Sequence, residues 1–181
     1  LMQNGEFLQV GHPNQLYTNP DNVDVARLIG SPEINITKGE IVSGGVQLGG
    51  AFIPVDFDHS VNGAVQVGIR PEAIFIEDLP GLAVSNEDRN GPNLNFVKTH
   101  IEDLGHEVLI HGRISDSDDH DIRIRAQKAN SYSEHNSLVS ADIINVQLNA
   151  RALLFFDMQG GRLNATFNTR SAEQTTTIGA V

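Results

Sequence analysis

Short runs in which apolar and polar residues alternate dominate the chain from Asn35 onward, for example in residues 122–126 and 146–150. A period of two residues is typical of strands with one buried face. Gly, Asn, Asp or Pro separates most of these runs, and glycine permits sharp bends between strands. The pattern predicts a mainly β fold, a small closed or partly closed antiparallel barrel. Its strands are expected in residues 38–57, 64–78, 95–114, 120–127 and 142–157.

The first thirty residues follow a different pattern. Pro13 and Pro20 bracket a segment suited to one packed helical turn, and Asp21 or Asn22 can cap a second short helix. The apolar residues of this second helix recur at roughly helical spacing: Val25, Leu28 and Ile29. Residues 5–11 are interpreted as a brief strand with no sheet of its own. Helices this short need a partner surface to be stable.

Two segments lack the strand pattern. Residues 79–93 are polar and rich in turn formers, which indicates a connection between two groups of strands. Residues 169–181 show little patterning and are expected to form a peripheral tail.

Composition narrows the class of protein. The chain has 181 residues, 39% of them hydrophobic and 19% charged, which is typical of an ordinary globular chain with a real core. Its net charge of −11 and the absence of a basic cluster argue against a nucleic-acid partner. The longest apolar runs, such as residues 152–156, are far too short to cross a bilayer. No cysteine is present, so thiol chemistry and disulfides are excluded.

Nucleotide chemistry of the P-loop kind finds no support in the sequence. A P-loop needs the string G-x-x-x-x-G-K-[ST], which the chain lacks. The glycine-rich residues 44–52 contain neither the lysine nor the hydroxyl, so they are interpreted as a bend between strands.

The spacing of the candidate metal ligands along the sequence does not fit a zinc or calcium motif. His106 and His111 are five apart, whereas the zinc helix motif needs histidines four apart, and on a strand an odd separation points them to opposite faces. Residues 116–121 hold several carboxylates, but Asp121 and Gln127 stand where a calcium loop needs Gly and Glu. A solvated hairpin tip is the favoured interpretation, and no metal is expected.

Four stretches resemble one family in their order and separation. They are residues 9–35, 67–74, 101–111 and 154–163, and the most specific motifs are Gln9-Val10-Gly11, Leu16-Tyr17, Ile29-Gly30-Ser31-Pro32 with Asn35, and Gly68-Ile69-Arg70-Pro71-Glu72. Over residues 1–165 the chain resembles the C-terminal half of the ATP-binding subunit of carbohydrate-importing ABC transporters of the maltose and glycerol-phosphate type. Mild departures at residues 24–26 and 34–35 leave the substrate subclass open.

The resemblance implies an organisation and a function. Residues 1–31 are expected to be the end of an ABC ATPase domain, a short α/β remnant. Residues 32–168 are expected to form an OB-like barrel of the MOP/TOBE type, built from both strand groups and serving in regulation and dimerisation, with residues 169–181 as the tail. The chain itself would be no enzyme and would hold no cofactor, although the parent protein would use Mg-ATP.

The resemblance also implies partners and a location. Two copies are expected to form a homodimer that drives membrane-spanning permease subunits from the cytoplasmic face of the membrane. A regulatory protein or a small-molecule effector is a further possible partner. Neither the transported solute nor the effector can be read from the residues.

Arg70, Pro71 and Glu72 form the motif with the most local chemistry. Arg70 can make a bidentate ion pair with a carboxylate, and Pro71 pushes Arg70 into an extended conformation. Two roles stay open, an ion pair that fixes a corner of the barrel and a regulatory or intersubunit surface. The family motifs add Gly105 and Asp157 as positions with a structural or regulatory role.

Two other classes of function are ranked below the importer. A free-standing OB-like module could bind an oligosaccharide or an oxyanion on one face. However, only 6% of the residues are aromatic and none is Trp, so the chain has few side chains on which sugars or bases could stack. An enzyme comes last, because no convergent catalytic set can be named.

Overall fold

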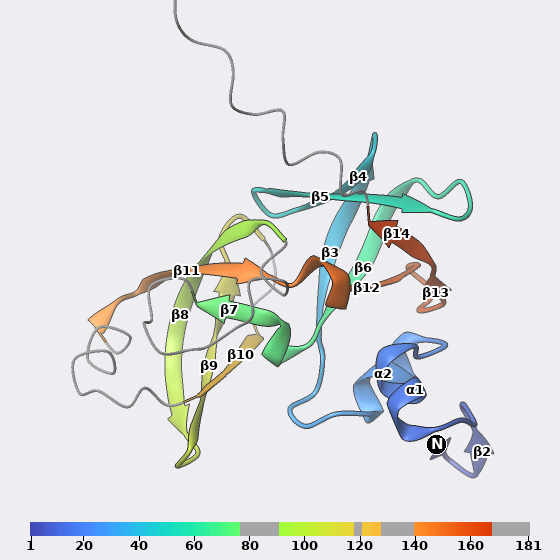
Figure 1. Ribbon diagram of the computed structural model, residues 1–181, viewed down its shortest axis with the longest axis horizontal. Helices are drawn as coiled ribbons and strands as arrows, with labels where there is room; N and C mark the ends of the chain where they lie inside the picture. The colour runs from blue at the N-terminus through green and yellow to red at the C-terminus, as the bar shows by residue number, and fades with distance from the viewer. Residues whose placement is uncertain (77–90, 118–120, 128–139, 168–181) are drawn as a thin grey trace, which may run out of the picture.

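The computed structural model describes residues 1–76, 91–117, 121–127 and 140–167 (Figure 1). The helical elements in these residues are α1 (Pro13–Thr18), α2 (Val23–Leu28) and the 3-10 turns η1 (Pro71–Ala73) and η2 (Ala150–Ala152). The strands are β1 (Met2–Gln3), β2 (Glu6–Phe7), β3 (Asn35–Val42), β4 (Gly45–Leu48), β5 (Ala51–Phe57), β6 (Gly63–Ile69), β7 (Ile74–Ile76), β8 (Asn93–Asp103), β9 (Glu107–Ile114), β10 (Ile122–Gln127), β11 (Ile143–Leu148), β12 (Leu154–Phe156), β13 (Arg162–Leu163) and β14 (Ala165–Phe167). The prediction of a mainly β chain is confirmed.

The larger sheet curls into a nearly closed antiparallel barrel. Its strand order is β13-β12-β6-β3-β4-β5-β14. The two ends of this order, β13 and β14, are separated along the chain by Asn164 alone. β13 pairs with β12 and β14 pairs with β5, so residues 162–167 join both edges. The chain therefore runs directly from one edge of the sheet to the other, which brings the two edges close together, as in a small barrel.

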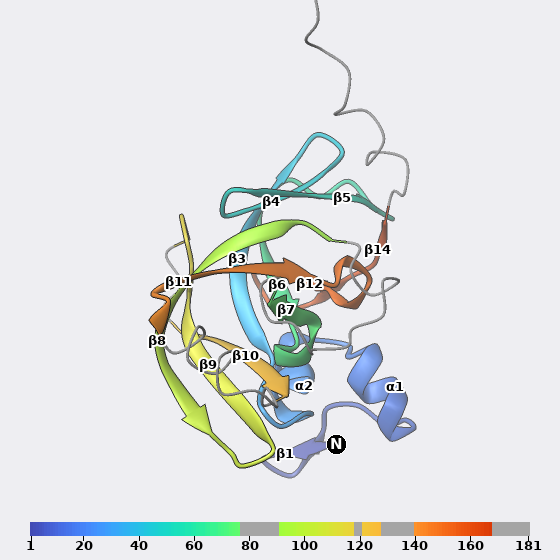
Figure 2. The same cartoon turned by 60° about the vertical axis from the view of Figure 1, so that its left-hand side comes forward.

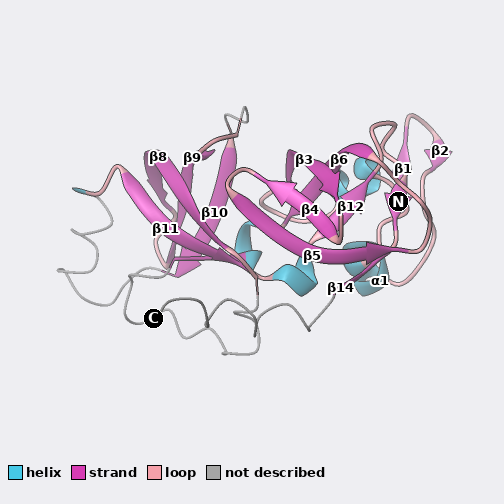
Figure 3. Ribbon diagram, turned by 90° about the horizontal axis from the view of Figure 1, so that it is seen from above, coloured by secondary structure: helices cyan, strands magenta, loops and turns pink. Residues whose placement is uncertain are grey.

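A second sheet, in the order β10-β9-β8-β11-β7, lies beside the barrel (Figure 3). Its two edge strands, β10 and β7, approach each other, so this sheet is also strongly curved (Figure 2). Buried side chains of both sheets form one continuous hydrophobic cluster, from Val46 and Ile53 of the barrel to Phe96 and Ile110 of the second sheet. The inward residues predicted in 122–126 and 146–150 are buried.

The chain passes between the two sheets at η1 and at η2. β6 belongs to the barrel and β7 to the second sheet, and the chain returns between β11 and β12. The predicted antiparallel barrel is therefore present, but the strand groups are divided differently from the prediction, which placed the division at residues 79–93. Within the predicted strand region, β6 and β7 are separate strands, because Pro71 cannot continue a hydrogen-bonded ladder. Asn93 already lies in β8, and residues 79–90 and 169–181 lie outside the described residues.

The N-terminal segment contains a hairpin that the sequence interpretation missed. β1 and β2 pair antiparallel, with Met2 opposite Phe7. Asn4 and Gly5 at the turn have φ of 52° and 86°, as a two-residue hairpin turn requires. The prediction of one brief strand without a sheet is therefore wrong, and the Asn-Gly pair was the signal that could have corrected it.

The two short helices form where they were predicted. Pro13 begins α1, and the Asn22 side chain caps α2 by accepting a hydrogen bond from the Val25 amide at 2.9 Å. Ala26 of α2 packs into a small apolar cluster with Leu154 and Phe156 of the barrel. None of the described helices has the length and apolar character that a bilayer-spanning helix needs.

Candidate functional site at the Arg70 junction

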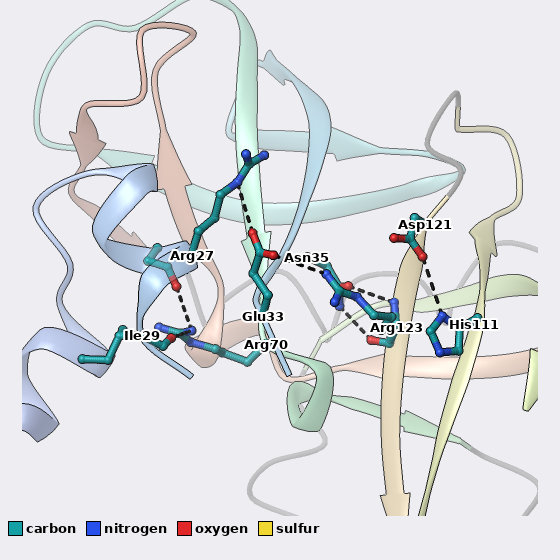
Figure 4. Close-up of polar contacts among 9 residues, drawn as sticks. Arg27, Ile29, Glu33, Asn35, Arg70, His111, Asp121 and Arg123 are labelled. Carbon is teal, nitrogen blue, oxygen red and sulfur yellow. Dashed lines mark hydrogen bonds and ion pairs between the residues drawn. The ribbon is translucent and has the colours of Figure 1, made fainter. Parts of the chain in front are cut away.

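Arg70 joins the N-terminal helices to the barrel. It lies between β6 and η1, and Pro71 holds its backbone extended, with φ of −63° and ψ of 139°. The side chain is 4% exposed and runs toward the helices (Figure 4). Its Nη1 donates to the carbonyls of Ala26 at 3.1 Å and Ile29 at 2.6 Å, and its Nη2 donates to the Tyr17 carbonyl at 2.9 Å. One guanidinium therefore binds both helical segments.

The three acceptors explain why an arginine suits this position. Tyr17 lies in the last turn of α1, Ala26 in the last turn of α2, and Ile29 is the C-cap of α2. Carbonyls at the end of a helix have no partner within the helix, and the helix dipole favours positive charge there. The guanidinium also lies 4.0 Å from the centre of the Tyr17 ring, a cation–π arrangement.

The predicted ion pair between Arg70 and a carboxylate is wrong for the described residues, where its hydrogen bonds go to carbonyl oxygens. The carboxylate of Glu72 instead accepts a hydrogen bond from the Tyr17 hydroxyl. The sequence pattern could not show this, because the helix ends lie more than 40 residues from Arg70. Burial lowers the pKa of Arg70 to about 10, so the guanidinium is still charged at neutral pH.

A pocket of about 450 Å³ opens at this junction. It is lined by α1, by η1 and by η2 with their flanking residues: Tyr17, Thr18, Arg70, Glu72, Ala73, Asn149, Arg151, Ala152 and Leu154. The two crossings between the sheets meet here, where the Asn149 amide donates to the Ala73 carbonyl at 2.8 Å. The pocket thus touches the helical segment and both points at which the chain changes sheets.

The other motif positions form turns and do not line the pocket. Gly105 has φ of 94° in the β8–β9 hairpin, and its amide donates to Asp103 Oδ1 at 2.8 Å. Asp157 follows β12, and its Oδ1 accepts hydrogen bonds from the Gln159 and Gly161 amides at 2.9 and 2.8 Å. In the structure both residues organise local backbone.

A second polar link, between Asn35 and Arg123, joins the two sheets (Figure 4). The Asn35 side chain donates to the Arg123 carbonyl and accepts from the Arg123 amide, both at 2.8 Å, as a neighbouring strand would. Glu33 lies between Arg123 at 3.9 Å and Arg27 of α2 at 3.6 Å. The signal that could have found this link is a polar residue at an inward position of β3, where Asn35 is 2% exposed.

His106 and His111, the two histidines weighed as metal ligands, differ in their surroundings. The side chain of His106 is 83% exposed, whereas that of His111 is 17% exposed, stacks on His100 at 4.1 Å and lies 3.7 Å from Asp121 (Figure 4). His106 precedes β9 and His111 lies within it, so opposite faces on one strand stay a prediction. Among the described residues, no group of three or more His, Asp or Glu could hold a metal ion. Residues 118–120 of the acidic stretch lie outside the described residues. Residues 44–52 are the β4–β5 hairpin, as expected.

Residues 30–74, from the end of α2 to the start of β7, match the family model described as the MalK OB fold domain. The match ends just past Arg70-Pro71-Glu72 and includes β3 to β6 of the barrel. This chain is a homologue of the ATP-binding subunits of carbohydrate-type ABC importers. The predicted family and the OB-type fold are thereby confirmed.

Three relatives of this importer family illustrate the likeness. An sn-glycerol-3-phosphate import ATP-binding protein of Psychromonas ingrahamii is 29% identical over 87% of this chain and 39% of its own length. The diacetylchitobiose uptake system ATP-binding protein of Streptomyces coelicolor is 31% identical over 63% of this chain and 33% of its own. An oligosaccharides import ATP-binding protein of Bacillus subtilis is 32% identical over 65% of this chain and 33% of its own length. The chain spans well under half the length of these relatives.

One solved structure that matches part of this chain is the cytoplasmic molybdate-binding protein ModG with molybdate bound. It has a TM-score of 0.46 and 9% sequence identity, and the match covers 67% of this chain and 94% of that one. A likeness of this degree bears on neither ligand nor mechanism.

Proposed function

We propose that this chain is the C-terminal regulatory and dimerisation region of an importer ATP-binding subunit that serves sugars or related solutes. The observation that carries the proposal is the Arg70 junction, in which one buried guanidinium binds the ends of two helical segments to an OB-type barrel. A rigid connection of this kind lets a movement of the helices reach the barrel, and the reverse. The family match supplies the importer context.

The domain boundaries follow from the same proposal. Residues 1–31 would be the last part of the ATPase domain, and residues 32–168 the OB-type region, with residues 169–181 as a tail. The proposed boundary lies between α2, which ends at Leu28, and β3, which begins at Asn35. Contacts cross this boundary at several points, including the Val23 amide to the Gly160 carbonyl at 2.9 Å and the Arg162 amide to the Asp21 carbonyl at 3.2 Å.

Mg-ATP, which the family implies, does not fit the residues present. The sequence has no P-loop lysine and hydroxyl to hold phosphates and Mg²⁺. The described residues also offer no carboxylate and histidine group suited to a metal ion. We therefore propose that this chain does not hydrolyse ATP on its own. A purified chain that turned over ATP through every step of fractionation would contradict this proposal.

The proposed partners are a second copy of the chain and, in the full protein, the permease subunits at the cytoplasmic face of the membrane. Light scattering over a concentration series tests the first of these partners. We expect the mass to rise toward that of a dimer, and Arg70→Met to leave the dimer intact if the barrel carries the contact. A mass of one chain at every concentration would contradict the dimerisation role.

A chimera tests the importer role. This chain would replace the aligned part of the Bacillus subtilis oligosaccharide import ATP-binding protein, and growth on oligosaccharide would be measured in a strain without that protein. We expect growth with the chimera and poor growth with the Arg70→Met chimera. A chimera that is stable and hydrolyses ATP but supports no growth would contradict the proposal.

A free-standing ligand-binding module is the second candidate, favoured by the pocket of about 450 Å³ at the junction. The chimera separates the two, because a free-standing module has no reason to restore import.

A further inference from the structure

The pocket at the Arg70 junction has the features of a site for a small molecule. Its volume of about 450 Å³ lies in the range of known ligand pockets, about 300 to 1,000 Å³. Its apolar lining residues are Ala73, Ala152 and Leu154, and its polar lining residues come from three separate elements.

The charge in the pocket favours an anion. Arg70 is almost fully buried, and its hydrogen bonds go to neutral carbonyls, so its charge is not balanced by a carboxylate within ion-pair distance among the described residues. Its Nε is buried and has no hydrogen-bond partner among the described residues. A buried charge without a counter-charge is costly, and a bound anion would relieve that cost.

A second guanidinium lies at the rim of the same pocket. Arg151 is exposed on η2 and makes no ion pair within the described residues. Two arginines therefore line one cavity in a chain whose net charge is −11. Arginine is well suited to phosphate and carboxylate groups, because its planar fork can donate two parallel hydrogen bonds.

Glu72 and Thr18 limit what the anion can be. The Glu72 carboxylate lines the pocket and would repel a ligand that is charged over its whole surface. It can, however, accept hydrogen bonds from hydroxyl groups, as it does from the Tyr17 hydroxyl. The Thr18 hydroxyl donates to the Asn14 carbonyl at 2.9 Å, so its oxygen can also accept from a ligand.

We propose that this pocket binds a small hydroxylated organic anion. Its phosphate or carboxylate group would face Arg151 and Arg70, and its hydroxyl groups would face Glu72 and Thr18. Such a ligand would touch α1, η1 and η2 at once, and would stabilise one arrangement of the helices relative to the two sheets. Its regulatory meaning rests on the proposed function, whereas the binding itself is a property of this chain.

The test measures binding to the whole chain by isothermal titration calorimetry. The probes are glucose 6-phosphate, gluconate, inorganic phosphate and uncharged glucose, at low ionic strength because salt screens exposed charges. We expect saturable binding of glucose 6-phosphate or gluconate, weaker binding of inorganic phosphate, and none of glucose. The first two probes separate a phosphate from a carboxylate ligand. No saturable binding of any anion up to about 20 mM would overturn the proposal.

Variants assign the binding to the pocket. Arg151→Gln is expected to weaken binding by about tenfold or more, because it removes a charge-assisted hydrogen bond. Arg113→Gln on β9 removes the same charge outside the pocket and is expected to change affinity less than about twofold. Equal affinities of the two variants would overturn the assignment. Urea unfolding checks that both remain as stable as the parent chain.

Glu72→Gln gives a result that a merely structural role would not produce. It removes the repulsion of anions but weakens the acceptor for hydroxyl groups. Inorganic phosphate should therefore bind more tightly to this variant, while the advantage of glucose 6-phosphate over phosphate shrinks. If Glu72→Gln left the ratio of the two affinities, glucose 6-phosphate over inorganic phosphate, unchanged, the proposed orientation of the ligand would be contradicted. A dimer that binds no anion would contradict this inference alone, and a monomer that binds one would contradict only the dimerisation role.

Discussion

Arg70→Met removes the guanidinium that binds the helical segments to the barrel while keeping much of the apolar stem. Three hydrogen bonds, to the carbonyls of Tyr17, Ala26 and Ile29, and one cation–π contact are lost. At about 1 kcal/mol for each hydrogen bond and about 0.5 to 1 kcal/mol for the ring contact, the gross loss is about 4 kcal/mol. Removing the buried charge also removes its desolvation cost of about 1 kcal/mol or more, so the free energy of unfolding should fall by a net of about 2 to 3 kcal/mol.

The effect should be concentrated in the helices. Helices of six residues, such as α1 and α2, are too short to be stable in water without a packing surface. Hydrogen–deuterium exchange should therefore show faster exchange of the α1 and α2 amides in the variant, with β3 to β6 unchanged. Urea unfolding followed by circular dichroism gives the change in the free energy of unfolding.

Arg27→Met is the matched control for this experiment. Arg27 also lies in α2, but its ion pair with Glu33 is 3.6 Å long and about half exposed, so its loss should cost less than about 1 kcal/mol. Unchanged exchange of the α1 and α2 amides in Arg70→Met, or a loss no larger than that of Arg27→Met, would refute the reasoning. Because burial lowers the pKa of Arg70 to about 10, the burial cost is present at neutral pH and fades only above that value. The effect of the variant should therefore be constant between about pH 5 and about pH 9.

Three further predictions concern other parts of the fold. Asn35→Ala removes both side-chain hydrogen bonds between β3 and β10 and should lower the free energy of unfolding by about 2 kcal/mol in urea titrations; no loss would mean that these bonds contribute little. Gly45→Ala would place a methyl group 2.1 Å from a backbone carbonyl oxygen and should lower the melting temperature strongly. In the control Gly50→Ala the new methyl group meets nothing closer than 3.9 Å, so the melting temperature should not fall. Equal melting temperatures of the two variants would contradict the close packing of the β4–β5 hairpin. The hydrogen bond from Arg125 at 2.7 Å lowers the pKa of Glu107 from its ordinary 4.5. The contribution of this bond to stability is therefore present above pH 4.5 and is lost as the pH falls through the lowered pKa. The urea midpoint should fall less steeply in acid for Glu107→Gln than for the parent chain, and identical slopes would contradict the link between Glu107 ionisation and stability.

The local elements of this protein were predictable because their causes are local. Alternation in residues 122–126 and 146–150 predicted inward faces that are buried, and the Asn22 cap and the proline at the start of α1 predicted the helices. The family motifs predicted an OB-type region. The hairpin at Asn4 and Gly5 was also predictable from its turn residues, although the interpretation passed over it.

The distribution of the strands over two sheets was decided by tertiary structure. A period of two residues gives the buried face of a strand but does not specify which strand lies beside it. The crossings at η1 and η2, and the closure of the barrel by residues 162–167, join segments that are far apart in the sequence. Pairing of this kind depends on how whole faces pack, so no single run of residues contains the information.

The sequence by itself determined the mainly β character, the two short N-terminal helices, the net negative charge, the absence of a P-loop and the likeness to importer subunits. It also marked Arg70 as a residue of interest, but it indicated the wrong partner. Only the tertiary structure brought the carbonyls of Tyr17, Ala26 and Ile29 to that guanidinium, and Arg151 to the same pocket. The physical reason is that a buried cation needs acceptors at fixed distances in space, and those distances are set by packing between elements rather than by spacing along the chain.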